Sequence, residues 1–161
     1  MDLRIKHEMT ANVVTIRAED TLDIAYAKMV RHEIRHLPVL DVQGNLVGIL
    51  SDRDIQRSLK SQISYGGPDG DFRSESCDFD PNTTVADYMT WPVKTLDKDV
   101  RLDIAAQRMM NEKISAFLVT ENKKIVGILT TDDLLRVLIS FLEKPQAGVR
   151  MTVNELMRAI A

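Results

Sequence analysis

Residues 47–55, VGILSDRDI, are repeated as residues 126–134, VGILTTDDL. In each copy a short apolar run predicts a buried strand, and a hydroxyl residue (Ser51 or Thr130) follows at the turn. An aspartate (Asp54 or Asp133) stands three places later in a predicted helix. A strand that leads directly into a helix presents backbone N–H groups, a hydroxyl and a carboxylate from one short segment. Two copies predict two such corners that face a shared interior.

The repetition extends over both halves of the chain. A shift that carries Met9 onto Met89 also aligns residues 22–25 with residues 102–105, which read Leu-Asp-Ile-Ala in both places. One residue is then lost in a turn, and the remaining shift aligns Gly48 with Gly127. About fifty residues correspond in the same order, which indicates an internal repeat.

Each repeat has the pattern of an α/β unit. In the first repeat we expect strands at residues 13–16, 37–40 and 46–50, and helices that begin near residues 20–21 and 51. The second repeat has the same order of strand, helix, strand, strand and helix, and a short helix is predicted ahead of each repeat. One unit of about fifty residues buries too little apolar surface to be stable alone. We therefore expect two units packed sheet to sheet about a pseudo-twofold axis.

Composition argues against several classes of protein. The formal net charge of −3 disfavours nucleic-acid binding, which depends on dense Lys and Arg. No apolar run approaches the roughly 18 residues of a membrane helix, and the N-terminus lacks the apolar region of a signal peptide. We expect no membrane association and a cytoplasmic location. The sequence shows neither a nucleophile elbow nor metal-ligand spacing, so we expect neither an enzyme nor a metal site.

Taken together, these features resemble the cystathionine β-synthase (CBS) domain pair, also called a Bateman module. The likeness rests on the two Met-Thr pairs at residues 9–10 and 89–90, on the strand start RHLPV at residues 35–39, and on the two Gly-x-x-Ser/Thr-x-x-Asp runs. The resemblance implies a homodimer with two clefts per chain, an adenosine-containing ligand in one or both clefts, and an effector protein that the module regulates.

The resemblance also suggests how the chain is divided. We predict CBS repeats at residues 1–60 and 83–144, joined by a flexible linker at residues 61–82. The remaining tail, residues 145–161, carries one amphipathic helix at residues 152–160.

Two aspartates are the main site residues that the resemblance implies. Asp54 and Asp133 match the carboxylate that accepts hydrogen bonds from both ribose hydroxyls in the family, a role that suits an acceptor-only group. The spacing from Ser51 to Asp54 and from Thr130 to Asp133 also fits a capping box, in which the carboxylate binds the backbone N–H of the capping residue. Spacing alone favours capping, whereas duplication within the family pattern favours ligand binding.

Phosphate binding is predicted for five residues near these corners: Ser51, Arg35, His36, Arg53 and Thr130. The two hydroxyl residues can cap a helix and still donate to a phosphate, and Arg35 and His36 can supply positive charge unless they simply form a solvated turn. The second repeat has Ser115-Ala116 in place of that basic pair, and Asp132 in place of Arg53. We therefore expect two unequal clefts, of which one suits a phosphate-rich ligand better.

The adenine base is expected to lie against two equivalent segments: Thr10, Asn12 and Val13 in the first repeat, and Thr90, Pro92 and Val93 in the second. In the family each segment lies across the pseudo-twofold axis from the other repeat's aspartate. Asp54 would then share a cleft with residues 91–93, and Asp133 with residues 11–13. Trp91 is a candidate for stacking on the base; shielding of the cleft mouth and a protomer contact are the alternatives.

The sequence thus predicts a regulatory sensor with no obligatory cofactor. The expected ligand is AMP, ADP or ATP, with S-adenosylmethionine as a further candidate, and its binding would shift the relative orientation of the repeats. The last helix of the second repeat is apolar almost all round, which predicts a dimer contact. The alternative function is a ligand-free scaffold whose fold and dimer surface hold a partner protein.

Overall fold

The computed structural model describes residues 3–60, 80 and 82–143. Except for residues 80 and 82, the predicted linker lies outside this range, and so does the predicted tail. The first half contains α1 (Ile5–Glu8), β1 (Ile16–Arg17), α2 (Leu22–His32), β2 (His36–Leu40), β3 (Leu46–Ser51) and α3 (Asp52–Lys60). The second half contains α4 (Val85–Tyr88), β4 (Thr95–Asp97), α5 (Leu102–Glu112), β5 (Ala116–Glu121), β6 (Lys124–Thr130) and α6 (Thr131–Glu143).

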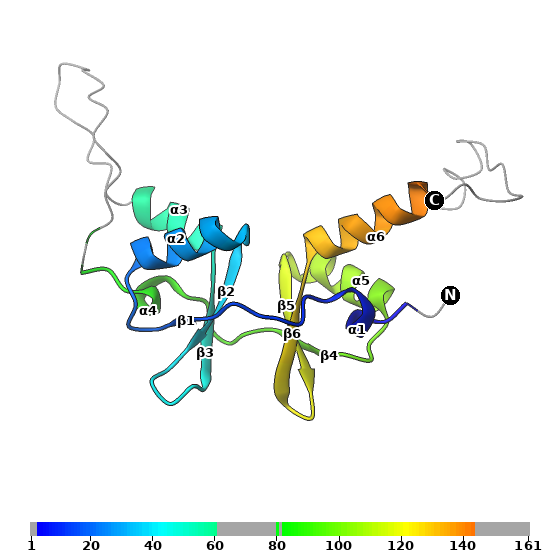
Figure 1. Cartoon of the computed structure of the whole chain (residues 1–161), viewed down its shortest axis with the longest axis horizontal. Helices are drawn as coiled ribbons and strands as arrows, with labels where there is room; N and C mark the ends of the chain where they lie inside the picture. Colours follow the sequence, from blue (N-terminus) through cyan, green and yellow to red (C-terminus); the bar gives the residue numbers. More distant parts are fainter. Residues whose placement is uncertain (1–2, 61–79, 81, 144–161) are drawn as a thin grey trace, which may run out of the picture.

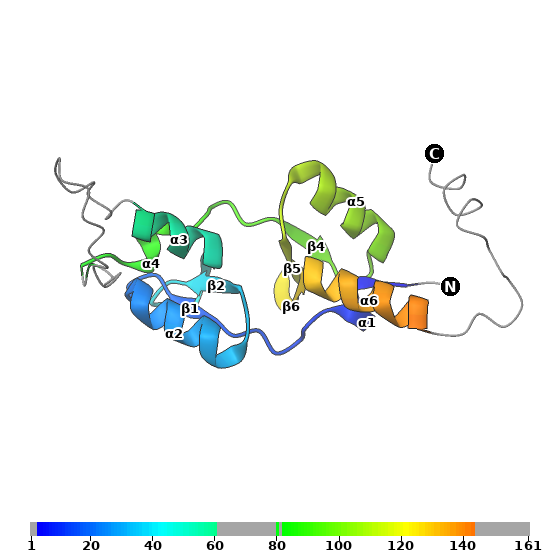
Figure 2. The same cartoon turned by 90° about the horizontal axis from the view of Figure 1, so that it is seen from above.

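The two halves have the same sheet topology. Each holds a three-stranded mixed sheet, ordered β1-β2-β3 or β4-β5-β6, in which the first pair is parallel and the second is the predicted antiparallel hairpin. The register is equivalent as well, because Val39 opposes Gly48 and Val119 opposes Gly127. Viewed from above, the hairpins meet near the centre and the long helices lie around them (Figure 2). The predicted α/β fold with two repeats is confirmed.

The first strand of each repeat was predicted too early and, in the first repeat, too long. β1 begins at Ile16 rather than Val13, and β4 begins at Thr95 rather than Val93. The residues just before them do not join their own sheet, because Thr10 pairs with Ile128 of β6 and Thr90 pairs with Ile49 of β3. These segments cross from one repeat to the other, so they are extended without being strands of either sheet.

The short helices α1 and α4 are exchanged between the repeats. Ile5 of α1 is fully buried in the core of the second repeat, and Val85 of α4 is fully buried in the core of the first. The exchange follows the same backbone contacts on both sides: Leu102 N–H donates to the Leu3 carbonyl at 3.0 Å, and Leu22 N–H donates to the Thr83 carbonyl at 3.3 Å. Figure 1 shows α1 beside α5 and α6, and α4 beside α2 and α3. Each repeat therefore completes its core with a helix from outside its own run of sequence.

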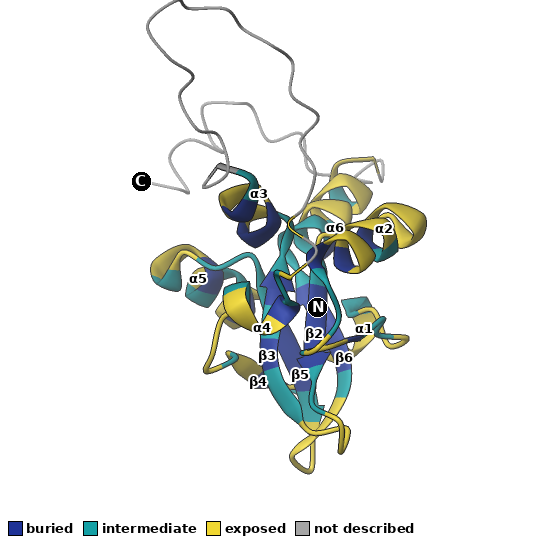
Figure 3. Ribbon diagram, turned by 90° about the vertical axis from the view of Figure 1, so that its left-hand side faces the viewer, coloured by how far each residue is buried: buried dark blue, intermediate teal, exposed yellow. Residues whose placement is uncertain are grey.

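Two methionines that follow the exchanged helices pack against the sheet of the other repeat. A Cβ added at Gly48 would lie 2.5 Å from Met89 Sδ, and a Cβ added at Gly127 would lie 2.6 Å from Met9 Sδ. Both glycines are therefore needed for space, because the methionine of the other half packs directly on the strand backbone. The hairpin strands β2, β3, β5 and β6 are buried or partly buried in this central region, and they become exposed only toward the hairpin tips (Figure 3).

Candidate functional site

At the first corner, β3 runs directly into α3 and Asp54 folds back onto the turn. The backbone N–H and the hydroxyl of Ser51 donate to Asp54 Oδ2 at 2.7 and 2.6 Å, and the Asp54 N–H points back to Ser51 Oγ at 3.4 Å. The second carboxylate oxygen, Oδ1, accepts from Arg57 one helical turn along α3. The side chain of Asp54 is thus held by both of its oxygens, and the residue is only 6% exposed.

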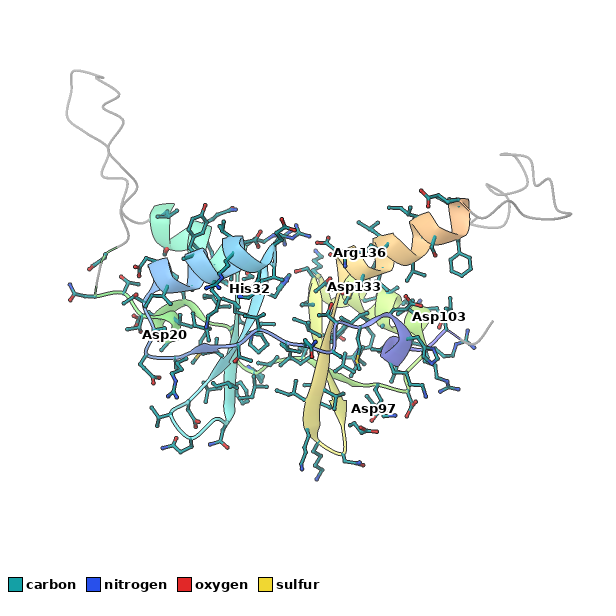
Figure 4. All side chains as sticks on the ribbon, in the orientation of Figure 1. Asp20, His32, Asp97, Asp103, Asp133 and Arg136 are labelled. Atoms are coloured by element: carbon teal, nitrogen blue, oxygen red, sulfur yellow. The ribbon has the colours of Figure 1, made fainter. Side chains whose placement is uncertain are left out.

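The second corner repeats this geometry where β6 runs into α6. The N–H and hydroxyl of Thr130 donate to Asp133 Oδ2 at 2.8 and 2.7 Å, and Arg136 donates to Oδ1 at 2.9 Å. Asp133 is also 6% exposed, and Figure 4 shows it beside Arg136 at the start of α6. Both predicted capping boxes are therefore present. One oxygen of each carboxylate completes the box, and the other accepts a hydrogen bond from an arginine one turn along the helix, the single partner it has among the described residues.

The two segments that were predicted to contact the adenine base lie against the strands that lead into these corners. Thr10 and Ile128 of β6 exchange two backbone hydrogen bonds of 2.9 and 3.0 Å, and Thr90 and Ile49 of β3 exchange two of 2.9 and 3.1 Å. Asp133 follows Ile128 by five residues, and Asp54 follows Ile49 by five. Each aspartate thus follows a strand that is paired with a segment of the other repeat: Asp133 follows β6, which pairs with Thr10, and Asp54 follows β3, which pairs with Thr90. The resemblance implied this arrangement, in which each segment lies near the other repeat's aspartate.

The side chains of these segments are available to solvent to different degrees. Thr10, Asn12, Thr90 and Pro92 are exposed, whereas Val13 and Val93 are partly buried. Trp91 is exposed at 60% and precedes Pro92 through a cis peptide bond. The assignment of these residues to a ligand stays a prediction.

Arg35 and His36 lie where the two repeats meet. Arg35 Nη2 is 2.5 Å from Asp132 Oδ1, and His36 Nε2 is 2.9 Å from Ser115 Oγ. Two of the residues that make the repeats unequal in sequence are therefore in contact: the extra arginine of the first repeat pairs with the extra aspartate of the second. The charge of Arg35 is thus compensated by a carboxylate. Arg53, the other predicted phosphate ligand, is exposed on α3.

Burial lowers the pKa of His36 below its usual value of 6.5, and the nearby guanidinium of Arg35 acts in the same direction. The carboxylates of Asp52, Asp132 and Asp54 oppose this shift without reversing it. The neutral imidazole is therefore the favoured form in the folded protein, which suits its contact with the Ser115 hydroxyl.

This lowered pKa predicts a loss of stability on acidification. Below the unfolded-state pKa of about 6.5, the unfolded chain binds a proton at His36 that the folded chain resists, so the free energy of unfolding falls as the pH falls. The difference in unfolding free energy between the wild type and His36→Gln should therefore be constant above about pH 7.5 and shrink toward about pH 5.5. Urea unfolding at several pH values measures it. A stability difference that grows on acidification would contradict a lowered pKa of His36 in the folded protein.

Two residues of the candidate site were not predicted from the sequence. Arg57 and Arg136 contact Asp54 and Asp133, and each follows its aspartate by three residues on the same helix. The signal was present, because Asp-x-x-Arg occurs at the same place in both repeats. Their side chains are 66% and 75% exposed, so each can leave its carboxylate without uncovering a core.

Among residues 3–60, 80 and 82–143, no group of three or more His, Cys, Asp or Glu side chains is arranged to hold a metal ion. In the same part of the chain, no helix combines the length and the apolar character needed to cross a membrane.

Comparison with known proteins agrees with this architecture. The profile of the CBS domain family matches residues 3–61 and 85–140. A CBS domain-containing protein of Dictyostelium discoideum is 29% identical over 144 residues, which cover 89% of this chain and 96% of that protein. The homoserine O-acetyltransferase of Methanocorpusculum labreanum is 30% identical over 133 residues, but the match covers only 23% of that enzyme and 82% of this chain.

A solved structure of the same architecture contains adenosyl ligands. The CBS domain pair of protein MJ0100, in complex with 5′-methylthioadenosine and S-adenosyl-L-methionine, superposes with a TM-score of 0.70 at 25% sequence identity. The superposition covers 88% of this chain and 99% of that one. From its two matched segments and its two equivalent sheets, the chain belongs to the CBS domain family and carries a tandem pair of CBS domains.

Proposed function

We propose that this chain is a regulatory module that binds an adenosine-containing ligand between its two repeats and acts on an effector protein through the resulting change of orientation. The observation that carries the proposal is the duplicated corner, in which a buried aspartate follows a strand paired with the crossing segment of the other half. The MJ0100 domain pair, which has the same fold, was solved with two adenosyl compounds. A ligand that contacts both the corner and the crossing segment would bridge the repeats.

In this proposal the ribose hydroxyls bind the aspartate oxygen that accepts a hydrogen bond from an arginine in the structure. Asp54 Oδ1 and Asp133 Oδ1 accept only from Arg57 and Arg136 among the hydrogen bonds found in the described residues. An ionised carboxylate has further acceptor capacity on each oxygen. The capping role and the ligand role are therefore compatible, because they use different oxygens of one group.

The contact between Arg35 and Asp132 sets which adenosine compound is preferred. A phosphate that approaches Arg35 must compete with a carboxylate 2.5 Å away, and it also approaches the negative charge of that carboxylate. An uncharged 5′ substituent such as a methylthio group meets neither penalty. We propose that adenosyl ligands with few phosphates bind more tightly than ATP. The homodimer remains part of this proposal through the exposed apolar face of α6.

Asp132→Asn tests this preference. The substitution removes one negative charge and frees Arg35, so the affinity for ATP should rise by about fivefold to tenfold, as expected for removal of one unit charge near a partly exposed phosphate. The affinity for 5′-methylthioadenosine should stay unchanged and serves as the internal control. Isothermal titration calorimetry at two salt concentrations measures both, and the gain for ATP should shrink at higher salt. An equal change for both ligands would count against a role of this ion pair in selectivity.

The proposed function itself is tested by titrating the full chain with 5′-methylthioadenosine, S-adenosylmethionine, AMP, ADP and ATP. Binding of at least one of them, with a change in protection from hydrogen exchange at Thr10–Val13 or Thr90–Val93, would support the module as a sensor. If none of the five gives heat or a change in protection, the proposal fails and the scaffold function is favoured.

A further inference from the structure

Arg57 and Arg136 occupy the same position in the two repeats. Each lies three residues after its aspartate, on the same face of α3 or α6, and donates to the Oδ1 atom of that aspartate. Among the described residues, Asp54 Oδ1 and Asp133 Oδ1 accept no other hydrogen bond. The arginine therefore holds the oxygen that the proposed function assigns to the ribose.

The acceptor capacity of this oxygen is too small for the arginine and a whole ribose together. An ionised carboxylate has about four lone-pair sites in all, which is about two on each oxygen. In both repeats Oδ2 accepts the N–H and the hydroxyl of the capping residue, and one site of Oδ1 accepts the arginine. A single site on Oδ1 is left, whereas the two hydroxyls of a ribose need two. A ribose that binds Oδ1 through both hydroxyls must therefore displace the arginine.

The arginines are placed so that they can leave. The side chains of Arg57 and Arg136 are 66% and 75% exposed, whereas those of their aspartate partners are 8% and 6% exposed. An ion pair whose cation lies largely in water is weak, because the released guanidinium regains its hydration. The carboxylate stays in place when the arginine leaves, since the capping box holds its other oxygen. Displacement therefore costs an ion pair but no packing.

We propose that Arg57 and Arg136 compete with the ligand: each blocks one lone-pair site of its aspartate until a ribose with two hydroxyls displaces it. This inference rests on the proposed function, because it concerns the same two carboxylates. The arginine lowers the affinity for a compound that needs both sites of Oδ1. A compound with one hydroxyl needs only the remaining site and binds beside the arginine.

Arg57→Met and Arg136→Met, alone and combined, test this competition in the full chain. Methionine has a similar helix propensity and lacks the donors of arginine. The affinity for uncharged 5′-methylthioadenosine should rise about twofold to fivefold in the double variant, the range expected for loss of an ion pair with an exposed partner. Isothermal titration calorimetry measures the gain, and the single variants show which cleft supplies it. Arg57→Lys and Arg136→Lys keep a charged donor and should return the affinity toward that of the wild type.

Three comparisons separate competition from a general effect of charge. Arg31→Met removes an exposed cation of α2 that forms no ion pair among the described residues, and it should leave the affinity unchanged. The 2′-deoxy counterpart of 5′-methylthioadenosine should gain nothing in the double variant, because it needs only one site of Oδ1. Added salt should raise the affinity of the wild type for uncharged 5′-methylthioadenosine by weakening the ion pair, and this dependence should vanish in the double variant.

The outcomes distinguish this inference from the proposed function. If wild type and double variant bind 5′-methylthioadenosine equally well, the competition is overturned and the proposed function stands. A lower affinity of the double variant also overturns it, since the arginine would then contribute to the bound state. An equal gain for the 2′-deoxy compound contradicts the count of acceptor sites. If 5′-methylthioadenosine binds neither protein, the competition is overturned, and the other four compounds of the panel decide the proposed function.

Discussion

Asp133→Asn and Asp54→Asn should each weaken binding at their own cleft at least about tenfold, while lowering the free energy of unfolding by only about 1 kcal/mol. The reason lies in the separate tasks of the two carboxylate oxygens. Oδ2 receives the N–H and hydroxyl of the capping residue, and an asparagine carbonyl oxygen can replace it there. The oxygen that would meet the ribose becomes an amide NH2, which cannot accept a hydrogen bond.

A capping box elsewhere in the chain provides the matched control. At the start of α4 the N–H and hydroxyl of Thr84 donate to Asp87 Oδ2 at 2.8 and 2.9 Å, which reproduces the local geometry of both corners with an exposed carboxylate. These bonds hold the pKa of Asp87 below its usual value, chiefly through the backbone N–H of Thr84. Asp87→Asn should lower stability by a similar amount without affecting ligand affinity. If Asp54→Asn and Asp133→Asn behave like Asp87→Asn, the two buried carboxylates serve the fold alone.

Gly127→Ala should lower the free energy of unfolding by about 1–3 kcal/mol, in the range of an overpacked core. The new methyl group would lie 2.6 Å from Met9 Sδ and 3.0 Å from the Thr10 carbonyl oxygen. Met9 can change rotamer, but the Thr10 backbone is fixed by its two hydrogen bonds with Ile128. Relief of the clash must therefore disturb the contact between the crossing segment and β6. Thermal or urea unfolding of the full chain measures the loss.

Gly48→Ala is the natural comparison for this substitution. A Cβ at Gly48 meets only side-chain atoms of Met89 within the closest contacts, at 2.5, 2.9 and 3.1 Å. Combining it with Met89→Ala should remove most of the additional destabilisation, whereas combining Gly127→Ala with Met9→Ala should leave a residual loss from the Thr10 carbonyl. If the methionine substitution restores stability to the same extent at both glycines, the backbone at Thr10 is not held as firmly as its hydrogen bonds indicate.

The features that could be predicted from the sequence are those whose signal is local and repeated. The hairpins, the order of elements and the capping boxes follow from residues close together in the chain, and the structure shows each of them in both repeats. The start of β1 was placed wrongly because residues 13–15 have the apolar character of a strand, yet the residues before them pair with the other repeat. Only the long-range partner decides whether such a segment joins its own sheet.

The features that escaped prediction depend on contacts between the halves. Nothing in residues 5–8 indicates that Ile5 belongs to the core of the second repeat, because an apolar residue on a short helix suits either core. The pairing of Arg35 with Asp132 was likewise hidden, since the two residues lie 97 positions apart. The sequence showed that the repeats differ in charge, but not that the two differences compensate each other. Because Arg35 is paired with Asp132, a phosphate could bind Arg35 only by displacing that carboxylate.

The central claim is that a carboxylate at each helix start binds the ribose hydroxyls of an adenosine-containing ligand. The most direct test compares the tightest binder of the ligand panel with its 2′-deoxy counterpart, on wild type, Asp54→Asn and Asp133→Asn, by calorimetry. The account predicts that removing the 2′-hydroxyl weakens binding to the wild type about tenfold and makes little further difference once the aspartate of the occupied cleft is replaced. A 2′-deoxy ligand that loses the same affinity on wild type and variants, or loses none on the wild type, would contradict it.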